Sequence, residues 1–145
     1  MDSILLLLRK PETQFGPKDF HALRVAIKRI KALLFLISAH CTDFRRKKQF
    51  KPFRKLFRQA GIVRELQLQE TILKKYGPEP VLTTYFNQLD VELHHEQQLF
   101  FKLNSQQIRK SLKAKAKKIL AALDIIKGGF VKRYLQEKGC SLVLQ

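Results

Sequence analysis

The stretch "HALRVAIKRIK", residues 21–31, decides how this sequence folds. Three cations and a histidine recur in it at steps of three, four and three residues: His21, Arg24, Lys28 and Lys31. Such steps return a side chain to the same face of an α-helix, and the apolar residues between the cations follow the same period. The stretch therefore predicts an amphipathic helix with stacked positive charge and no acid among the cations.

The same pattern predicts a helix over 17–41 and a second helix over 44–60, which opens at Pro52 or is bent by it. In the first helix one apolar arc faces away from the cations and comprises Leu23, Ala26, Ile27, Ile30, Leu33, Leu34 and Ile37. The second helix has an apolar arc of Phe50, Phe53, Leu56, Phe57 and Ala60. Its opposite arc is purely basic and consists of Lys47, Lys48, Lys51, Arg54, Lys55 and Arg58. Both helices supply a core face without using a charged residue.

The remaining sequence also has helical periodicity, interrupted by glycine and proline. Further helices are predicted at 2–9, 62–76, 79–103, 105–127 and 130–138, with Ser105 as an N-terminal cap. The breaks are expected at Gly61, at the turn "GPEP" and at Gly128–Gly129. The prediction is an all-α fold: an antiparallel, four-helix-bundle-like arrangement with short extra terminal helices, forming one domain over residues 1–145.

The charge of the chain is strongly positive, at +17 with a pI near 10.2. The segment from Lys18 to Arg58 holds thirteen basic residues and two acidic ones, Asp19 and Asp43. A single basic helix face is often only a solvated surface. Solvated faces usually mix the two signs, however, because mixed pairs stabilise a helix and like pairs destabilise it. Two consecutive faces of one sign favour a binding surface for an extended anion.

Motifs for enzyme chemistry are not recognisable in the sequence. There is no glycine-rich phosphate loop, no Ser–His–Asp arrangement in a recognisable context, and no carboxylate cluster on the basic helices to hold Mg²⁺. His94 and His95 are adjacent, so they point about 100° apart on a helix and cannot both ligate one metal. We expect a binding protein with no catalytic residues, no cofactor and no metal site.

The apolar run at residues 4–8 is too short to span a bilayer and lacks the flanks of a signal peptide. The predicted location is therefore cytoplasmic. Binding to a membrane surface is not expected, because the apolar arcs of the basic helices are needed for the core.

The two basic helices resemble the CHAD family, α-helical domains named for their histidines. The family's first helix follows H-x-x-R-V-x-x-[RK]-R-[LI]-[RK], and the matching residues here are His21, Arg24, Val25, Lys28, Arg29, Ile30 and Lys31. Its second signature is a basic helix that leads into L-G-x-x-R-D. Here "KLFRQAGIVREL" supplies Lys55, Arg58, Gly61, Arg64 and Glu65, with Ala60 in place of leucine and Glu65 in place of aspartate. The similarity covers about residues 18–76.

This resemblance implies binding of inorganic polyphosphate, for which sulfate or phosphate would be a mimic, in a basic groove or central pore. It also implies two four-helix bundles related by pseudo-twofold symmetry, usually in a chain about twice this long. The segment "QQIRKSLK" at 106–113 aligns weakly with 21–28, with Arg109 and Lys113 at the positions of Arg24 and Lys28.

The predicted function is non-enzymatic polyphosphate binding along a groove formed by the first two long helices. The predicted polyphosphate-binding residues are His21, Arg24, Lys28, Arg29, Lys31, Lys47, Lys48, Lys51, Arg54, Lys55, Arg58, Arg64, Arg109, Lys113 and Lys117.

Two alternative functions remain open at the level of sequence, nucleic-acid binding and a structural module in an assembly, and a homodimer is expected with any of them. A sequence-nonspecific nucleic-acid-binding helical protein would have the same charge, but its phenylalanines would be expected among the cations rather than in the core arc, and nucleic acid is therefore expected to be the weaker competitor. A homodimer would supply the second bundle that the resemblance implies.

Overall fold

The computed structural model describes residues 2–41, 43–77 and 80–143. The helices in these ranges are α1 (Asp2–Leu7), α2 (Pro17–His40), α3 (Arg46–Leu73), α4 (Pro80–Leu103) and α5 (Gln106–Val143), with a short 3₁₀ turn at Glu12–Gln14. No strand occurs in the described ranges, and the predicted all-α fold is confirmed. None of the helices in these ranges is both long and apolar enough to cross a membrane.

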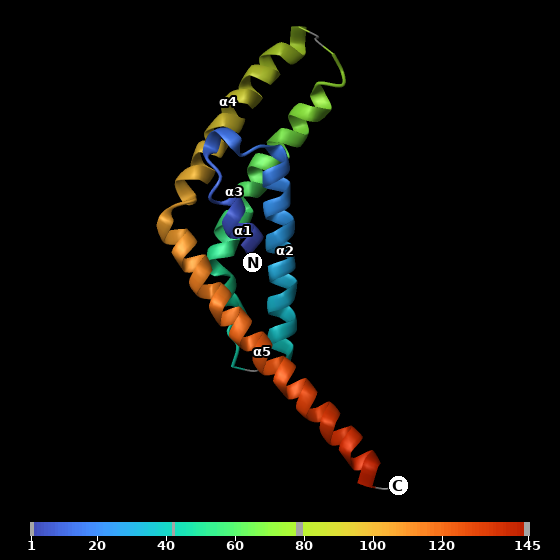
Figure 1. The fold of residues 1–145 in the computed structure, drawn as a ribbon. Coiled ribbons are helices and arrows are strands. Elements are labelled where there is room, and N and C mark those ends of the chain that lie inside the picture. Colours follow the sequence, from blue (N-terminus) through green and yellow to red (C-terminus); the bar gives the residue numbers. More distant parts are fainter. Residues whose placement is uncertain (1, 42, 78–79, 144–145) are drawn as a thin grey trace.

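The helices form an elongated bundle (Figure 1). α2 and α3 lie antiparallel against each other, and α3 and α4 form a hairpin that extends beyond the start of α2. α4 and α5 together make a third leg, which bends at an elbow between them at Asn104–Ser105. The short α1 packs against α2 and occupies the fourth position of the bundle over part of its length. Beyond the end of α2, α5 continues away from the other helices.

The core lies where the apolar arcs of α2 and α3 meet. From α2 the buried residues are Phe20, Leu23, Ile27, Ile30, Leu34 and Ile37, and from α3 they include Phe50, Phe53, Leu56, Ala60 and Val63. Ala26 and Leu33, which belong to the predicted arc of α2, are partly buried and pack against this core, as does Phe57 of α3. The two apolar arcs predicted from the sequence are therefore confirmed.

Aromatic rings close the core near the start of α2. The ring of Phe20 lies 4.9 Å from that of Phe100 and 4.8 Å from that of Phe15, measured between centroids. Both contacts are edge-to-face, the geometry that aromatic rings prefer. This cluster joins the segment before α2 to the last turn of α4, and it therefore fixes the elbow relative to α2.

The prediction of two helices over 44–60 and 62–76 is wrong, because α3 runs without interruption from Arg46 to Leu73. A glycine inside a helix costs about 1 kcal/mol relative to alanine. The buried residues on both sides of Gly61, Ala60 and Val63, offset that cost by packing on the core. Pro52 also lies inside α3, where Phe50 and Phe53 are buried on either side of it.

The prediction of a break at Gly128–Gly129 is also wrong, because α5 continues through both glycines to Val143. The separate helix expected at 130–138 is part of α5, so α1 is the one short terminal helix in the described ranges. The predicted cap at Ser105 is confirmed by geometry. The backbone N–H of Ile108 donates a hydrogen bond of 3.3 Å to the Ser105 side-chain oxygen.

A carboxylate anchors the start of α2. The side chain of Asp19 accepts a 2.9 Å hydrogen bond from the backbone N–H of Gly16, the residue before the helix, and a 2.7 Å bond from the Lys10 ammonium. The Lys10 hydrogen bond lowers the pKa of Asp19 below its ordinary value of 3.8, and the Gly16 bond and the charge of Lys10 add to this against a smaller opposing effect of burial. The ionised carboxylate therefore stabilises the folded state.

Replacing Asp19 should test this anchor. Asp19→Asn should lower the free energy of unfolding by about 1 kcal/mol near pH 7, since Lys10 loses its charged partner and the Gly16 N–H bonds to a neutral amide oxygen in place of a carboxylate. Because the folded-state pKa is lowered, the contribution is complete above the unfolded-state pKa and disappears as pH falls through the folded-state pKa. Urea unfolding of both proteins from about pH 7 to about pH 2 measures the difference, which should shrink in acid. Asp43→Asn, at an exposed position without an ion pair, is the matched control; equal losses for the two variants would contradict the anchor.

Candidate functional site

Basic side chains from α2 and α3 meet at a shallow depression between the two helices. It has a volume of about 150 Å³ and is lined by Leu34 and Phe50 together with four cations: Lys31, Arg46, Lys47 and Arg54. We call these four cations the basic seam. Lys31 ends the motif of the first helix, and Lys47 and Arg54 are seven residues apart on one face of α3. The Arg46 guanidinium also lies 5.1 Å from the centre of the Phe35 ring, a cation–π contact that orients it.

The cations of the seam have no acidic partner. The described residues form two ion pairs, Lys10–Asp19 and Lys74–Glu70, and neither involves a residue between 21 and 58. In this segment the two helices therefore bring like charges together without compensation inside the chain. Repulsion between exposed charges is screened by salt, but it remains unfavourable. An anion bound at the seam would remove it.

Arg24 is placed differently from the prediction, which set it on the side opposite to the core. It is half-buried between α2 and α3, where its guanidinium donates a 3.0 Å hydrogen bond to the backbone oxygen of Phe57. The same guanidinium lies 4.4 Å from the centre of the Phe57 ring. Arg24 is half-buried because it lies at the edge of the apolar arc of α2, on the flank that α3 covers. Arg24 therefore clamps α2 to α3.

Gly61 makes this clamp possible. A Cβ atom built on Gly61 would collide with the terminal nitrogen of Arg24, so a larger residue would push the guanidinium away from Phe57. Glycine at this point of the helix therefore serves the close approach of the guanidinium and not a turn. The structure thereby connects the two sequence signatures: the arginine of the first signature rests on the glycine of the second.

The other predicted residues of α2 and α3 are mostly exposed. On α2 these are His21, Lys28 and Arg29, and on α3 they are Lys48, Lys51, Lys55 and Arg58. Arg64 is half-buried, and it forms no ion pair with Glu65, the residue that stands in place of the family's aspartate. Of the seven exposed residues, His21, Lys28, Arg29 and Arg58 add to the basic surface of α2 and α3, whereas Lys48, Lys51 and Lys55 line the other flank of α3.

The residues predicted on α5 do not join the seam. Arg109 is half-buried at the elbow, where one guanidinium nitrogen donates hydrogen bonds to the backbone oxygen of Asn104 at 2.8 Å and, more weakly, to that of Leu8 at 3.4 Å. It holds the end of α1 against the elbow and lines a separate pocket of about 250 Å³. Lys113 and Lys117 are exposed on α5. The alignment of 106–113 with 21–28 therefore does not reproduce the surface of α2.

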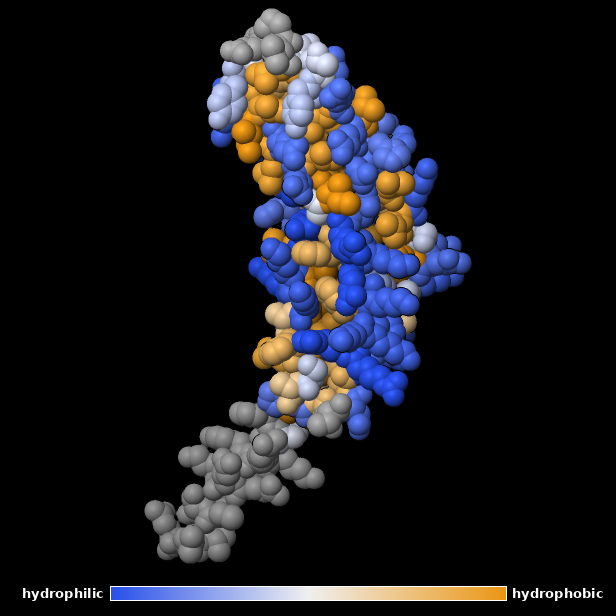
Figure 2. Space-filling view, turned by 180° about the vertical axis from the view of Figure 1, so that it is seen from behind, coloured by the Kyte–Doolittle hydropathy of each residue, from blue (hydrophilic) through white to orange (hydrophobic). Residues whose placement is uncertain are grey.

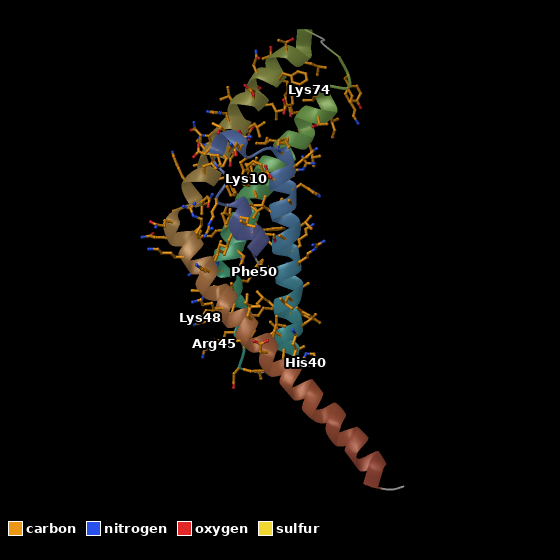
Figure 3. The ribbon with its side chains drawn as sticks, in the orientation of Figure 1. Lys10, His40, Arg45, Lys48, Phe50 and Lys74 are labelled. Carbon is orange, nitrogen blue, oxygen red and sulfur yellow. The ribbon has the colours of Figure 1, made fainter. Side chains whose placement is uncertain are left out.

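A larger groove lies on the other flank of α3, between this helix and the α4–α5 leg. Its volume is about 890 Å³, and five lysines line it: Lys48, Lys51, Lys55, Lys102 and Lys115. We call it the lysine groove. In Figure 3 the labelled Lys48 lies at the end of α3 that approaches α5, whereas Lys74 lies at the far tip of the α3–α4 hairpin. Figure 2 shows hydrophilic residues gathered over the middle of the rear face around a strip of hydrophobic ones.

Sequence reasoning missed Lys102 and Lys115, because these residues belong to the third leg rather than to the basic helices. The period of α5 could have identified Lys115, which lies seven residues after Ile108 and four after Ser111 on one helix face. Nothing in the sequence shows that this face is directed toward α3, because that depends on the elbow.

The described residues contain no group of three or more His, Cys, Asp or Glu side chains placed to hold a metal ion. His94 instead forms a 2.9 Å hydrogen bond with Gln98, one turn further along α4.

Comparison with known families gives one match: the model of the CHAD domain matches residues 6–139. The chain belongs to the CHAD family. The match extends well beyond the 18–76 segment that carried the sequence resemblance and includes α4 and most of α5. No curated protein and no solved structure matches the chain significantly.

The contact between Arg24 and Gly61 can be measured by a double-mutant cycle. Alanine in place of a glycine inside a helix ordinarily stabilises it by about 1 kcal/mol. Here Gly61→Ala displaces the Arg24 guanidinium, whose hydrogen bond and ring contact contribute about 0.5–1.5 kcal/mol each. The substitution should therefore be about 1 kcal/mol more favourable in an Arg24→Ala background than in the wild type. Urea unfolding of the four proteins gives this coupling energy, and identical effects of Gly61→Ala in both backgrounds would disprove the clamp.

Proposed function

We propose that this CHAD protein binds inorganic polyphosphate, without catalysing a reaction, along the basic surface of α2 and α3 that centres on the basic seam. One observation carries the proposal. Four cations from two helices line a common depression, and no cation of the described 21–58 segment has an acidic partner. The resemblance of both signatures to a family associated with polyphosphate supports the same ligand.

The chemistry of the surface fits a linear phosphate polymer. Polyphosphate carries about one charge per phosphate and condenses counterions, so each Lys or Arg that replaces a counterion gains the entropy of its release, as with nucleic acids. Arg54 can face phosphate oxygens with its planar fork, whereas Lys31 and Lys47 act as adaptable point charges. The motif from His21 to Lys31 covers about 15 Å of helix, which suits a ligand whose charge repeats along its length.

A binding role is also favoured by what the seam lacks. Phosphoryl-transfer enzymes hold Mg²⁺ with carboxylates beside the phosphate chain. The six residues that line the seam depression include no Asp or Glu.

Nucleic acid carries phosphates as polyphosphate does, but it also carries bases. Proteins that bind single strands stack bases on exposed aromatic rings. Among the residues that line the seam the one aromatic ring, that of Phe50, is buried; the nearby ring of Phe35 is 60% exposed and has the Arg46 guanidinium over one face. Long-chain polyphosphate should therefore displace duplex DNA when the two are compared at equal charge concentration and fixed salt.

Ligand binding should stabilise the folded protein. At low salt and at polyphosphate about 100-fold above its Kd, the free energy of unfolding should rise by about 2.7 kcal/mol. For a domain of this size, that raises Tm by about 8 °C. Sulfate at the same charge concentration should give a smaller increase, because it reaches fewer cations at once. Thermal unfolding followed by circular dichroism measures both, and an unchanged Tm with saturating polyphosphate would refute the proposal.

The location of the site can be separated from the effect of overall charge. Lys28→Glu with Lys31→Glu should weaken polyphosphate binding far more than Lys18→Glu with Lys75→Glu, a control at two exposed positions that take part in neither Lys10–Asp19 nor Lys74–Glu70. Both doubles change the net charge by about four units, so a diffuse field predicts equal losses. The first double should also flatten the dependence of log affinity on log salt by about 0.7–0.9 per lost contact. Titrations at several salt concentrations test this, with circular dichroism to confirm folding; equal losses would mean that charge alone is recognised.

A further inference from the structure

The lysine groove differs in chemistry from the basic seam, because its lysines surround an apolar strip. The apolar side chains of its lining are Pro52 from α3, Leu99 and Leu103 from α4, and Ile108 from α5. Pro52 is buried and the other three are half-buried, whereas Lys48, Lys51, Lys55 and Lys102 are exposed. The groove therefore has an apolar floor and a positively charged rim, with no Asp or Glu among its lining residues.

The groove exists because the third leg bends away from α3. Ser105 caps α5 and starts it in a new direction, and Arg109 ties the elbow to the end of α1 through Asn104 and Leu8. Residues around the bend line the groove: Leu103 before it and Ser105, Gln107 and Ile108 after it. These contacts hold the elbow in place, and the groove is present without a ligand.

The distribution of charge decides between possible occupants. The lysines lie on both walls: Lys48 and Lys55 are seven residues apart on α3, and Lys102 and Lys115 stand on the α4–α5 leg. Polyphosphate would match these charges but would leave the apolar floor uncovered. A single-headed amphiphile would cover the floor but has charge at one end only, so most of the lysines would stay unmatched.

An acidic amphipathic helix meets both conditions, because its apolar stripe is flanked on each side by carboxylates that repeat at every turn. We propose that the lysine groove binds an acidic amphipathic helix of a partner protein. The α3 wall from Lys48 to Gln59 is about 16 Å long, which corresponds to three turns of a bound helix. The long lysine side chains can cover the edges of the apolar stripe while their ammonium groups reach its carboxylates.

This site is separate from the proposed polyphosphate surface, although both use α3. Lys102 and Lys115 belong to the groove and do not line the seam, whereas Lys31 belongs to the seam and does not line the groove. Substitutions at these positions therefore distinguish the two sites, and the inference does not require polyphosphate binding to be correct.

The probe is a synthetic, end-blocked peptide of about sixteen residues made of Leu, Glu and Ala, with Leu at helical spacing on one face. A peptide of the same composition with the Leu residues scattered is its control. Fluorescence anisotropy should show binding of the amphipathic peptide, and binding of the scattered peptide should be at least about tenfold weaker. Equal binding of the two peptides, or no binding of either, would overturn the proposal.

A crossed set of variants then locates the peptide. Lys102→Glu with Lys115→Glu should weaken peptide binding by about tenfold or more, whereas Lys28→Glu with Lys31→Glu should lower it no more than the control double Lys18→Glu with Lys75→Glu. Polyphosphate affinity should show the opposite ranking. If the Lys102/Lys115 double weakens polyphosphate as strongly as the Lys28/Lys31 double and leaves the peptide unaffected, the groove is part of the polyphosphate surface and the proposal is wrong. If polyphosphate binds neither the wild-type protein nor any of these variants, the function proposed for the seam is refuted, and the peptide result is unaffected.

Discussion

Apolar packing of α2 on α3 is the interaction on which the rest of the molecule depends, because it holds two basic helices together against their own charge. Burying one Leu, Ile or Phe side chain contributes about 1.5–3 kcal/mol, and these two helices bury ten such residues between them. A pair of exposed like charges 4 Å apart in water costs about 1 kcal/mol before salt screening. The free energy gained by burying apolar side chains exceeds the repulsion between the cations. The apolar core therefore holds the two basic helices side by side.

The Arg24 guanidinium contacts both the backbone and a ring of the facing helix, and this contact accounts for the glycine in the middle of a long helix. The guanidinium lies on the Phe57 ring and backbone beside Gly61, where α3 has no side chain in the way. A lysine could not cover the ring with a planar group, and a residue larger than glycine would exclude the guanidinium. This contact fixes how far α2 and α3 are offset along each other. It therefore determines that Lys31 of α2 lies level with Lys47 and Arg54 of α3 at the seam.

The features that could be predicted from the sequence are those set by neighbours within one helix. The extent of α2, the buried arcs of α2 and α3 and the cap at Ser105 all follow from spacing over a few residues. The continuity of α3 through Gly61 could not be predicted in this way, since the glycine there signals a contact with Arg24 and not the end of a helix. The role of Arg24 was missed for the same reason: helical spacing places it on the edge of an arc, but only the position of α3 decides whether that edge faces water.

In the candidate surfaces, too, features within one helix could be predicted from the sequence, whereas features that depend on how helices pack could not. The cations of α2 and α3 could be identified in advance because the acids missing from both helices are visible in the sequence. The position of Lys102 and Lys115 beside α3 could not be predicted, because it depends on the elbow at Asn104–Ser105, and that bend is fixed by contacts with Leu8, about a hundred residues away along the chain.

The position of α3 between two neighbours turns one basic arc into two different surfaces. On the flank toward α2, Lys47 and Arg54 face another basic helix, and the depression there is lined mainly by charge. On the flank toward the α4–α5 leg, Lys48 and Lys55 face a wall that contributes Leu99, Leu103 and Ile108. A ligand held by charge alone loses affinity steeply as salt rises, whereas a ligand that also covers apolar surface keeps the part of its affinity that comes from burial. The two flanks of a single helix are therefore suited to two ligands that differ in how they respond to salt, although the lysines of both flanks come from the same continuous arc of the sequence.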